Sequence, residues 1–504
     1  MKLKTLFITI IIATLLVACK GNGQDMNTSK EERIVYENSV VKTIETQLEG
    51  LKMDEIRAKA PLIMEKSISE LQKSIADGEL TYTELTAFYL DRIMKYDKSK
   101  NGLNAIVEIN PKAIEKAKLL DKNREEINNA MYGIPILLKD NINTSDMPTS
   151  AGTYAMKDFV PRVDAEFVKK LREKNAIILG KANLSELANY MDFGMPSGYS
   201  SKLGQTHNPF DPLNISPSGS SSGSAVGVAA NLSAAAFGTE TTGSIISPAN
   251  INSIVGFKPS KDFISTEGVV PLSSTMDTVG PMTKNVSDAV ELFNATINDN
   301  SKTIKLNTDT NNLEGARIGV PKDNEKLVKA LKDAGAVVVE VELKEMDNEF
   351  IFTNDFARDF KNYAEKYSAP IKSLEDLVEF NEKDMKRRAK YGQGLVEDAA
   401  DSKADSDKKV SDTVKETREY IDKIIKDNKL DAIAFIGDVN VVQPCVAGYP
   451  MIAVPFGQNE YNEPTGVTFT STHGDDQKLV NLAYSFESKT QNRLIPEKYL
   501  EKNK

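Results

Sequence analysis

The chain has 504 residues, of which 40% are hydrophobic and 27% charged, and its formal net charge is −10. These values are typical of a globular protein that is large enough to bury a substantial core. The lysines and arginines form no basic stripe that could follow a phosphate backbone, so a nucleic-acid partner is not expected.

The first residues of the chain read as a processing signal. Two lysines precede the apolar run LFITIIIATLLVA at residues 6–18, which is too short for a comfortable transmembrane helix. The run ends in LVAC at residues 16–19, which resembles the lipobox of bacterial lipoproteins, where the signal is cut before a cysteine that then carries the lipid. We therefore expect residues 1–18 to be a lipoprotein signal peptide and Cys19 to anchor the protein to a bacterial membrane, outside the cytoplasm. An ordinary secretory signal with an incidental cysteine is the alternative.

A polar segment separates this signal from the main part of the chain. Residues 19–64 are expected to hold the lipidated cysteine, a polar tether (KGNGQDMNTSKEE, residues 20–32) and an N-terminal extension. Residues 65–500 contain no tandem repeat and no proline- or glycine-rich linker, which favours a single domain. The other cysteine, Cys445, has no partner in the mature chain, so no intrachain disulfide is expected.

From Ser67 onward, helical patterns come first. Residues 67–97 predict two helices that are separated at Asp77-Gly78, and a third helix is expected to open at Pro111, a favourable first-turn residue. A further helix is expected to end at Lys174.

Apolar runs bounded by polar or glycine residues predict the strands. The first is GIPILLKDNI at residues 133–142, and the second covers Ala176–Leu179. The alternation with helices favours an α/β fold in which helices are layered on a mixed, mainly parallel sheet. Further runs of this kind are residues 254–257, 316–320, 336–341, 432–436 and 451–456.

Residues 216–249 are rich in serine but do not have the composition of a linker. A serine and glycine linker should stay polar along its length, because it has nothing to pack against. Here the apolar residues between Ala225 and Phe237 suit a helix that is buried on nearly every side. A polar turn at the mouth of a buried helix can hold hydroxyls and backbone amides in fixed positions. We therefore interpret the stretch as a reaction centre.

A serine nucleophile needs a base, and the chain has only two histidines. Residues 219–223 (GSSSG) fit the G-x-S-x-G elbow, with Ser221 as nucleophile and His473 downstream. That motif requires a strand directly before it, and the preceding NPFDPLNISPS contains three prolines, so the elbow is disfavoured. Lysine can replace histidine where burial keeps its amine neutral, and Lys139 follows the apolar run of residues 134–138. An exposed lysine at a strand end is the alternative on these residues alone.

Several ordered motifs resemble the amidase signature family, and the resemblance spans residues 65–495. It implies a large mixed, mainly parallel sheet covered by helices on both sides, with one catalytic domain over residues 65–500. The stretches KSLEDLVEFNEKD and YGQGL are most similar to bacterial peptide-amidase-like members. The motifs that carry the resemblance are GIPILLKDN (133–141), GKANLSELA (180–188), the serine-rich stretch with GTETTGSIISPA (238–249), VGFKPS (255–260), MDTVGPM (276–282) and AGYPMIAVPFG (447–457).

The resemblance implies a Ser-cisSer-Lys triad. Lys139 takes the place of the general base, Ser220 that of the bridging serine after a cis peptide bond, and Ser244 that of the acylated nucleophile. Ser221 matches a supporting hydrogen-bond position. No metal or organic cofactor has a role in this scheme.

The turn before the nucleophile is expected to supply the oxyanion hole. Its donors would be the backbone N–H groups of Thr241, Thr242, Gly243 and Ser244. The turn departs from the common family pattern, since Glu240, Thr242 and Ile246 stand where aspartate, glycine and arginine are usual. A threonine would be costly at position 242 if that position required a positive φ.

These features predict an exported amidase that hydrolyses carboxamide C–N bonds through an acyl-serine, with terminal amides of peptides as the expected substrates. The expected partners are a small-molecule or peptide amide and, through the lipid, a membrane; no obligate protein partner is expected. The alternatives are a lipid-anchored binding protein without turnover and a fatty-acyl amide hydrolase. The family also includes the amidotransferase subunit that makes glutaminyl-tRNA, but an exported protein meets no tRNA.

Overall fold

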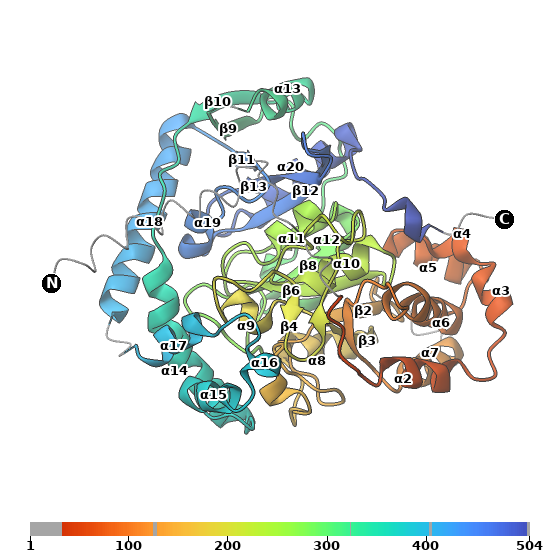
Figure 1. The fold of residues 1–504 in the computed structure, drawn as a ribbon. Coiled ribbons are helices and arrows are strands. Elements are labelled where there is room, and N and C mark those ends of the chain that lie inside the picture. The colour runs from red at the N-terminus through yellow and green to blue at the C-terminus, as the bar shows by residue number, and fades with distance from the viewer. Residues whose placement is uncertain (1–32, 124–128, 323, 403–405, 501–504) are drawn as a thin grey trace. The chain divides into compact units, whose positions relative to one another are not determined.

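The computed structural model describes residues 33–123, 129–322, 324–402 and 406–500 (Figure 1). The described residues from Val35 onward form one compact unit. The predicted signal peptide, Cys19 and the polar tether at residues 20–32 lie outside the described residues. In the part of the chain that is described, no helix combines the length and the apolar composition needed to cross a bilayer.

An 11-stranded mixed sheet forms the centre of the described unit, in the order β1-β3-β2-β6-β8-β7-β12-β13-β11-β9-β10. The neighbours within β3-β2-β6 and within β11-β9-β10 are parallel, and the other neighbours are antiparallel. A second small sheet pairs β4 with β5. The strands are β1 (Ile106–Ile109), β2 (Pro135–Lys139), β3 (Ile177–Ala182), β4 (Tyr199–Ser200), β5 (Gly204–Gln205), β6 (Ala235–Glu240), β7 (Val255–Lys258), β8 (Thr278–Thr283), β9 (Arg317–Pro321), β10 (Val337–Val341), β11 (Ala432–Ile436), β12 (Met451–Gln458) and β13 (Pro464–Thr470).

Helices surround the sheet and fill the crossovers between its strands (Figure 1). They are α2 (Val40–Leu48), α3 (Met53–Arg57), α4 (Ala60–Ile63), α5 (Ile68–Ala76), α6 (Tyr82–Arg92), α7 (Ala113–Lys122), α8 (Glu166–Glu173), α9 (Glu186–Asn189), α10 (Ser222–Ala229), α11 (Ile246–Ile251), α12 (Val286–Thr296), α13 (Glu325–Asp333), α14 (Glu349–Tyr367), α15 (Leu374–Glu382), α16 (Met385–Arg388), α17 (Gly394–Ala400), α18 (Asp407–Asn428), α19 (Val442–Ala447) and α20 (Asp476–Thr490).

The alternation of side chains along β6 shows that both faces of the sheet are covered. Phe237 packs against Phe167 of α8, with ring centroids 5.2 Å apart. The next residue, Gly238, faces the other way, since a Cβ built there would lie 2.7 Å from the Oγ of Ser221, the residue before α10. Because neighbouring strand residues point to opposite faces, α8 and α10 lie on opposite sides of the sheet. The expected arrangement of a sheet between two helical layers is confirmed.

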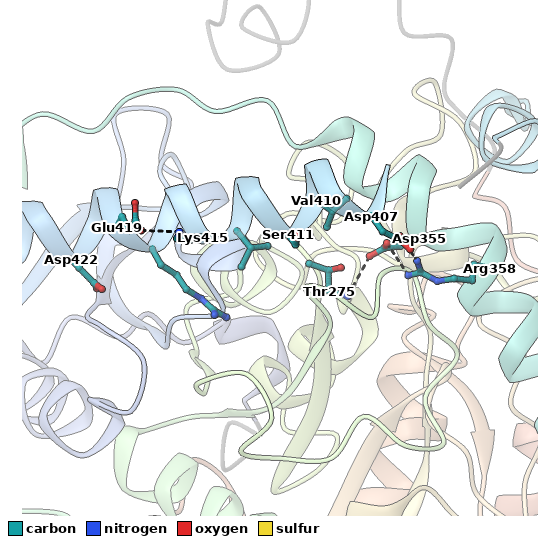
Figure 2. Close-up of a pocket in the computed structure, with 11 residues that line it drawn as sticks. Thr275, Asp355, Arg358, Asp407, Val410, Ser411, Lys415, Glu419 and Asp422 are labelled. Carbon is teal, nitrogen blue, oxygen red and sulfur yellow. Dashed lines mark hydrogen bonds and ion pairs between the residues drawn. The ribbon is translucent and has the colours of Figure 1, made fainter. Parts of the chain in front are cut away.

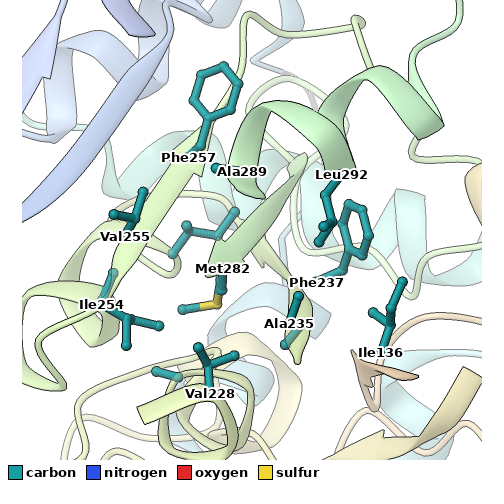
Figure 3. Packing of buried hydrophobic residues seen from close by; sticks show 14 of the residues in the cluster. Ile136, Val228, Ala235, Phe237, Ile254, Val255, Phe257, Met282, Ala289 and Leu292 are labelled. Carbon is teal, nitrogen blue, oxygen red and sulfur yellow. The ribbon is translucent and has the colours of Figure 1, made fainter. Parts of the chain in front are cut away.

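Figure 3 shows the part of the main hydrophobic core that lies where β6, β7 and β8 meet α10 and α12. Val228 of α10 reaches the sheet from one face, whereas Leu292 of α12 lies beside Phe237. Phe257 and Met282 are also fully buried in this region. Close packing on both faces holds the carboxyl end of β6 rigidly, and that end leads into the serine-bearing turn.

Most of the predicted elements are found, with shifts at their ends. α5 and α6 are separated at Asp77, and each begins with a capping box, on Ser67 and Thr81. The third helix starts at Ala113, two residues beyond Pro111. The strand predicted at Ala176–Leu179 runs on to Ala182 as β3.

One prediction in the serine-rich stretch is wrong. The buried helix expected between Ala225 and Phe237 ends at Ala229, and residues 235–240 form the buried strand β6. Alanine suits a helix, so Ala235 and Ala236 gave no local signal of a strand. They are drawn into the sheet by pairing with β2 and β8 on either side. Tertiary contacts therefore override local propensity at this point.

The large mixed sheet is confirmed, with more antiparallel neighbours than the sequence pattern indicated. Three strands that the sequence pattern did not predict, β1, β8 and β13, each pair antiparallel with their neighbours. The N-terminal extension also has structure, since its residues 40–63 form α2, α3 and α4. Of these, α2 packs against β1, α6 and α7.

Candidate active site

Lys139 is the last residue of β2, and its side chain is completely buried. Its Nζ lies 2.7 Å from the Oγ of Ser220. It also donates to Thr239 of the neighbouring strand β6, at 2.9 Å to Oγ1 and 3.1 Å to the carbonyl oxygen. These contacts hold the amine at the carboxyl ends of two parallel strands, so the lysine is not an exposed residue at a strand end.

The surroundings of Lys139 favour its neutral form. Burial lowers the pKa of Lys139 to about 7, against the opposing effect of the Asp277 and Glu240 carboxylates. A cation loses its hydration when it enters the interior, so burial disfavours the charged amine. The apolar run before Lys139 therefore produces the environment that the sequence led us to expect.

Ser220 faces this amine from the turn that precedes α10. The peptide bond between Gly219 and Ser220 is cis, as the family resemblance implies. The carbonyl oxygen of Ser220 accepts a hydrogen bond from the N–H of Ser185 at 3.1 Å. A Cβ at Gly219 would lie 2.2 Å from the Ser185 Oγ, so a larger residue there would displace the hydroxyl that accepts a hydrogen bond from the N–H of Gly198. The Lys139–Ser220 contact is the first half of the predicted relay.

Ser221 connects this turn to Ser244. Its N–H donates to the carbonyl oxygen of Ser244 at 3.1 Å, and its Oγ donates to that of Thr239, also at 3.1 Å. The backbones that carry Ser220 and Ser244 are thereby held side by side. Ser244 is 6% exposed, and among the described residues its hydroxyl has no hydrogen-bond partner. The second contact of the relay, from the Ser244 Oγ to the Ser220 Oγ, is therefore not formed here.

The turn that carries Ser244 is fixed from one side by Asp277. The Thr241 Oγ1 donates to the Asp277 carboxylate at 2.6 Å, and the N–H groups of Leu272 and Ser273 donate to its other oxygen. Burial raises the pKa of Asp277 to about 6, although these hydrogen bonds oppose the shift. The positive φ in the turn, +79°, belongs to Gly243. Thr242 therefore carries no backbone strain of this kind.

Glu240 fixes the same turn from inside the protein. One carboxylate oxygen accepts hydrogen bonds from the N–H groups of Ile245 and Ile246, at 2.7 and 2.9 Å. The other oxygen accepts from the Cys445 thiol at 3.2 Å. Burial raises the pKa of that thiol well above its usual value, which keeps it protonated as a donor. The side chain of Ile246 is buried, so an arginine there would need a partner that isoleucine does not.

The elbow alternative is excluded by the positions of its two residues. Ser221 bonds to the backbone of Thr239, whereas the His473 Nε2 lies 3.1 Å from the carbonyl oxygen of Lys261, and its ring packs against Phe263. The residues before Ser221 also form no strand, which the elbow would require.

Sequence reasoning missed the contribution of Thr239, which accepts hydrogen bonds from both Lys139 and Asn141. The signal would have been the pairing of β6 with β2, which aligns Phe237 with Leu138. Because the residues up to Phe237 were expected to form a helix, the sequence did not predict that Thr239 lies beside Lys139.

A separate cavity of about 520 Å³ lies between α14 and α18 and contains none of these residues (Figure 2). Arg358 pairs there with Asp355 of its own helix and with Asp407 of α18. The backbone N–H of Thr275 also donates to Asp355, which ties the loop leading to Asp277 to α14. Among the described residues, no group of three or more His, Cys, Asp or Glu side chains is arranged to hold a metal ion.

Comparison with known proteins gives consistent results. Residues 84–436 match the family model described as Amidase. A crystal structure of an amidase family protein from Bacillus anthracis is 39% identical, covers 92% of this chain and 99% of its own, and superposes with a TM-score of 0.89. The peptide amidase of Stenotrophomonas maltophilia is 35% identical, with coverages of 86% and 98% and a TM-score of 0.81. A probable amidase of Arabidopsis thaliana is 36% identical over 86% of this chain and 92% of its own length.

Proposed function

The chain belongs to the amidase family and is a hydrolase of amide C–N bonds, and from this premise we propose that it cleaves them through an acyl intermediate on Ser244. Ser220 and Lys139 act as the proton relay in this proposal. The observation that carries it is the 2.7 Å contact between a fully buried lysine and Ser220. A lysine that is neutral near pH 7 can perform the task that histidine performs in other serine hydrolases.

In the first step, neutral Lys139 accepts the proton of Ser220 while Ser220 accepts the proton of Ser244. The Ser244 oxygen attacks the carbonyl carbon, and the C=O electron pair moves to the oxygen. The backbone hydrogen bond between residues 221 and 244 holds the two segments side by side, and the proposal requires the Ser244 hydroxyl to come within hydrogen-bonding distance of the Ser220 Oγ when substrate is bound. Hydrogen bonds in an empty site often tighten only when substrate binds.

The backbone N–H groups of residues 241–244 stabilise the negative charge that develops on the carbonyl oxygen of the substrate. Asp277 holds the Thr241 hydroxyl and Glu240 holds the N–H of Ile245, so the turn that carries the N–H groups of residues 241–244 is already fixed before the reaction. Losing one such donor typically lowers the rate by about 10²- to 10³-fold. When the tetrahedral intermediate collapses, the C–N bond breaks and the amine leaves with the proton held by the relay. Water then attacks the acyl-serine with the same relay as base, which releases the acid and restores Ser244.

We propose terminal amides of peptides as the substrates. The proposal is supported by the likeness to a peptide amidase over 86% of this chain. A panel of peptide amides, fatty-acyl amides and anilides tests it, with release of ammonia or amine as the measurement. We expect the highest kcat/KM for the peptide amides. A preference for long acyl chains would replace the proposal with a fatty-acyl amide hydrolase, and binding without turnover would replace it with a non-catalytic protein.

We also propose that the enzyme acts outside the cytoplasm as a lipoprotein, on the evidence of the apolar run and the LVAC sequence at residues 16–19. Cells that express the full chain with an alkyne fatty acid should yield a labelled protein in the membrane fraction. Cys19→Ala should abolish the label and release the protein from the membrane. Membrane association of the unlabelled variant would contradict the lipid anchor, and Cys445→Ala serves as the control that keeps the label.

A further inference from the structure

Thr242 borders the approach to the nucleophile. Ser244 is almost buried, so a substrate must reach it past the solvent-facing side of the turn. Of residues 241–244, Thr242 alone is partly exposed, whereas Thr241, Gly243 and Ser244 are buried. Thr242 is therefore the residue of this turn that is open to solvent beside Ser244.

Asn348 links this turn to α14. It directly precedes the helix, and its Nδ2 donates to the Thr242 Oγ1 at 3.3 Å. Asn348 is itself only partly buried, so the pair forms a side wall at the edge of the site, two residues from Ser244.

The helix behind Asn348 is fixed, so the wall cannot easily move back. The Tyr190 hydroxyl donates to the Glu349 carboxylate at 3.0 Å, and the Tyr190 ring lies 5.2 Å from that of Phe352. One turn further along α14, the buried Asp355 accepts a hydrogen bond from the Ser273 Oγ at 2.7 Å. These contacts hold α14 at two places. A bulky group beside Ser244 would therefore meet a side wall that is fixed in position.

We propose that the Thr242–Asn348 pair is a specificity determinant that limits the width of the substrate at the scissile amide. The inference rests on the proposed role of Ser244. It assigns a function to the threonine at a position where the common family pattern has glycine. Narrow primary amides are accepted, and groups that branch next to the carbonyl carbon or on the amide nitrogen are excluded.

The test compares kcat/KM for two series of amides in the wild type, Thr242→Ala and Asn348→Ala. One series runs from N-acetylglycinamide to N-acetylvalinamide, and the other runs from a primary amide to its N-propyl amide and anilide. Each truncation should raise the ratio of kcat/KM for bulky over narrow substrates by about tenfold in at least one series, the lower end of the range for small changes in a pocket. An unchanged ratio in both series would overturn the inference.

Two further variants distinguish a change in the substrate width that the site accepts from a general structural defect. Thr242→Val keeps the bulk of the side chain without the hydroxyl, so it should keep the wild-type ratio. Asn294→Ala, whose side chain bonds only the backbone of Ile304, is the matched asparagine control and should also keep it. A structural defect would lower kcat for all substrates together and leave the ratio unmoved. Absence of turnover by the wild type on every amide would overturn the proposed function, and the inference with it.

Discussion

Ser244→Ala is expected to lower kcat for amide hydrolysis by about 10⁶-fold, which is the scale of loss when a serine hydrolase loses its nucleophile. The variant keeps the turn, because the hydroxyl of Ser244 makes no hydrogen bond among the described residues. It also keeps the backbone contact from Ser221, which uses only the carbonyl oxygen of residue 244. The loss should therefore appear in kcat while thermal unfolding stays close to that of the wild type.

Covalent labelling with a fluorophosphonate probe tests the role of Ser244 as the nucleophile without a substrate. The wild type should become labelled at Ser244, and Ser244→Ala should not react. The matched control is Ser224→Ala in α10, which removes a buried hydroxyl that donates to the carbonyl oxygen of Phe237 at 3.1 Å. It should lose about 1 kcal/mol of stability and keep the label. Labelling of Ser244→Ala at another serine of residues 216–224 would reassign the nucleophile.

Lys139→Met should reduce kcat/KM by several orders of magnitude, because general acid–base catalysis typically contributes about 10²- to 10⁴-fold and no other base contacts Ser220 among the described residues. Methionine has a similar length and needs no proton loss on burial, so the fold should survive. Lys258→Met is the control, since Lys258 is also fully buried and donates only to the carbonyl oxygen of Tyr449, at 2.8 Å. Comparable activity loss in both variants would indicate a structural cause.

The pH dependence of kcat/KM should report the same residue. The relay requires the neutral amine, and burial places the pKa of Lys139 at about 7. Activity should therefore fall about tenfold per pH unit below 7, rise through 7 and level off above it. An amine with the ordinary pKa of about 10.4 would instead give a rate that climbs beyond pH 9. A flat profile from pH 5 to 9, with chemistry limiting the rate, would contradict the assignment.

The elements that could be predicted from the sequence are those whose local pattern agrees with their final surroundings. β2, β11 and β12 lie in continuous apolar runs, and both of their faces are buried. β8 and β13 escaped prediction because TVGPMT and PTGVTFT contain glycine and proline, which usually mark turns. Their place in the sheet depends on partners that are distant along the chain.

In the candidate site, too, some residues could be predicted from local sequence motifs and others could not. The positions of Lys139, Ser220 and Ser244 could be assigned from ordered motifs, because each motif lies in one short segment. The contacts that tune them could not be predicted in this way. Asp277 reaches Thr241 from a loop 36 residues further along the chain, and Asn348 reaches Thr242 from 106 residues away. Such pairs leave no local pattern in a single sequence.

The placement of β6 between β2 and β8 also determines when the chemistry can begin. Lys139 and Ser220 are 81 residues apart along the chain, and Lys139 is an ordinary protonated lysine until β6 and α10 bury it. A nascent or partly folded polypeptide therefore carries the sequence of a hydrolase without its reactivity. The neutral base and its contact with Ser220 therefore form together, when β6 pairs with β2 and β8.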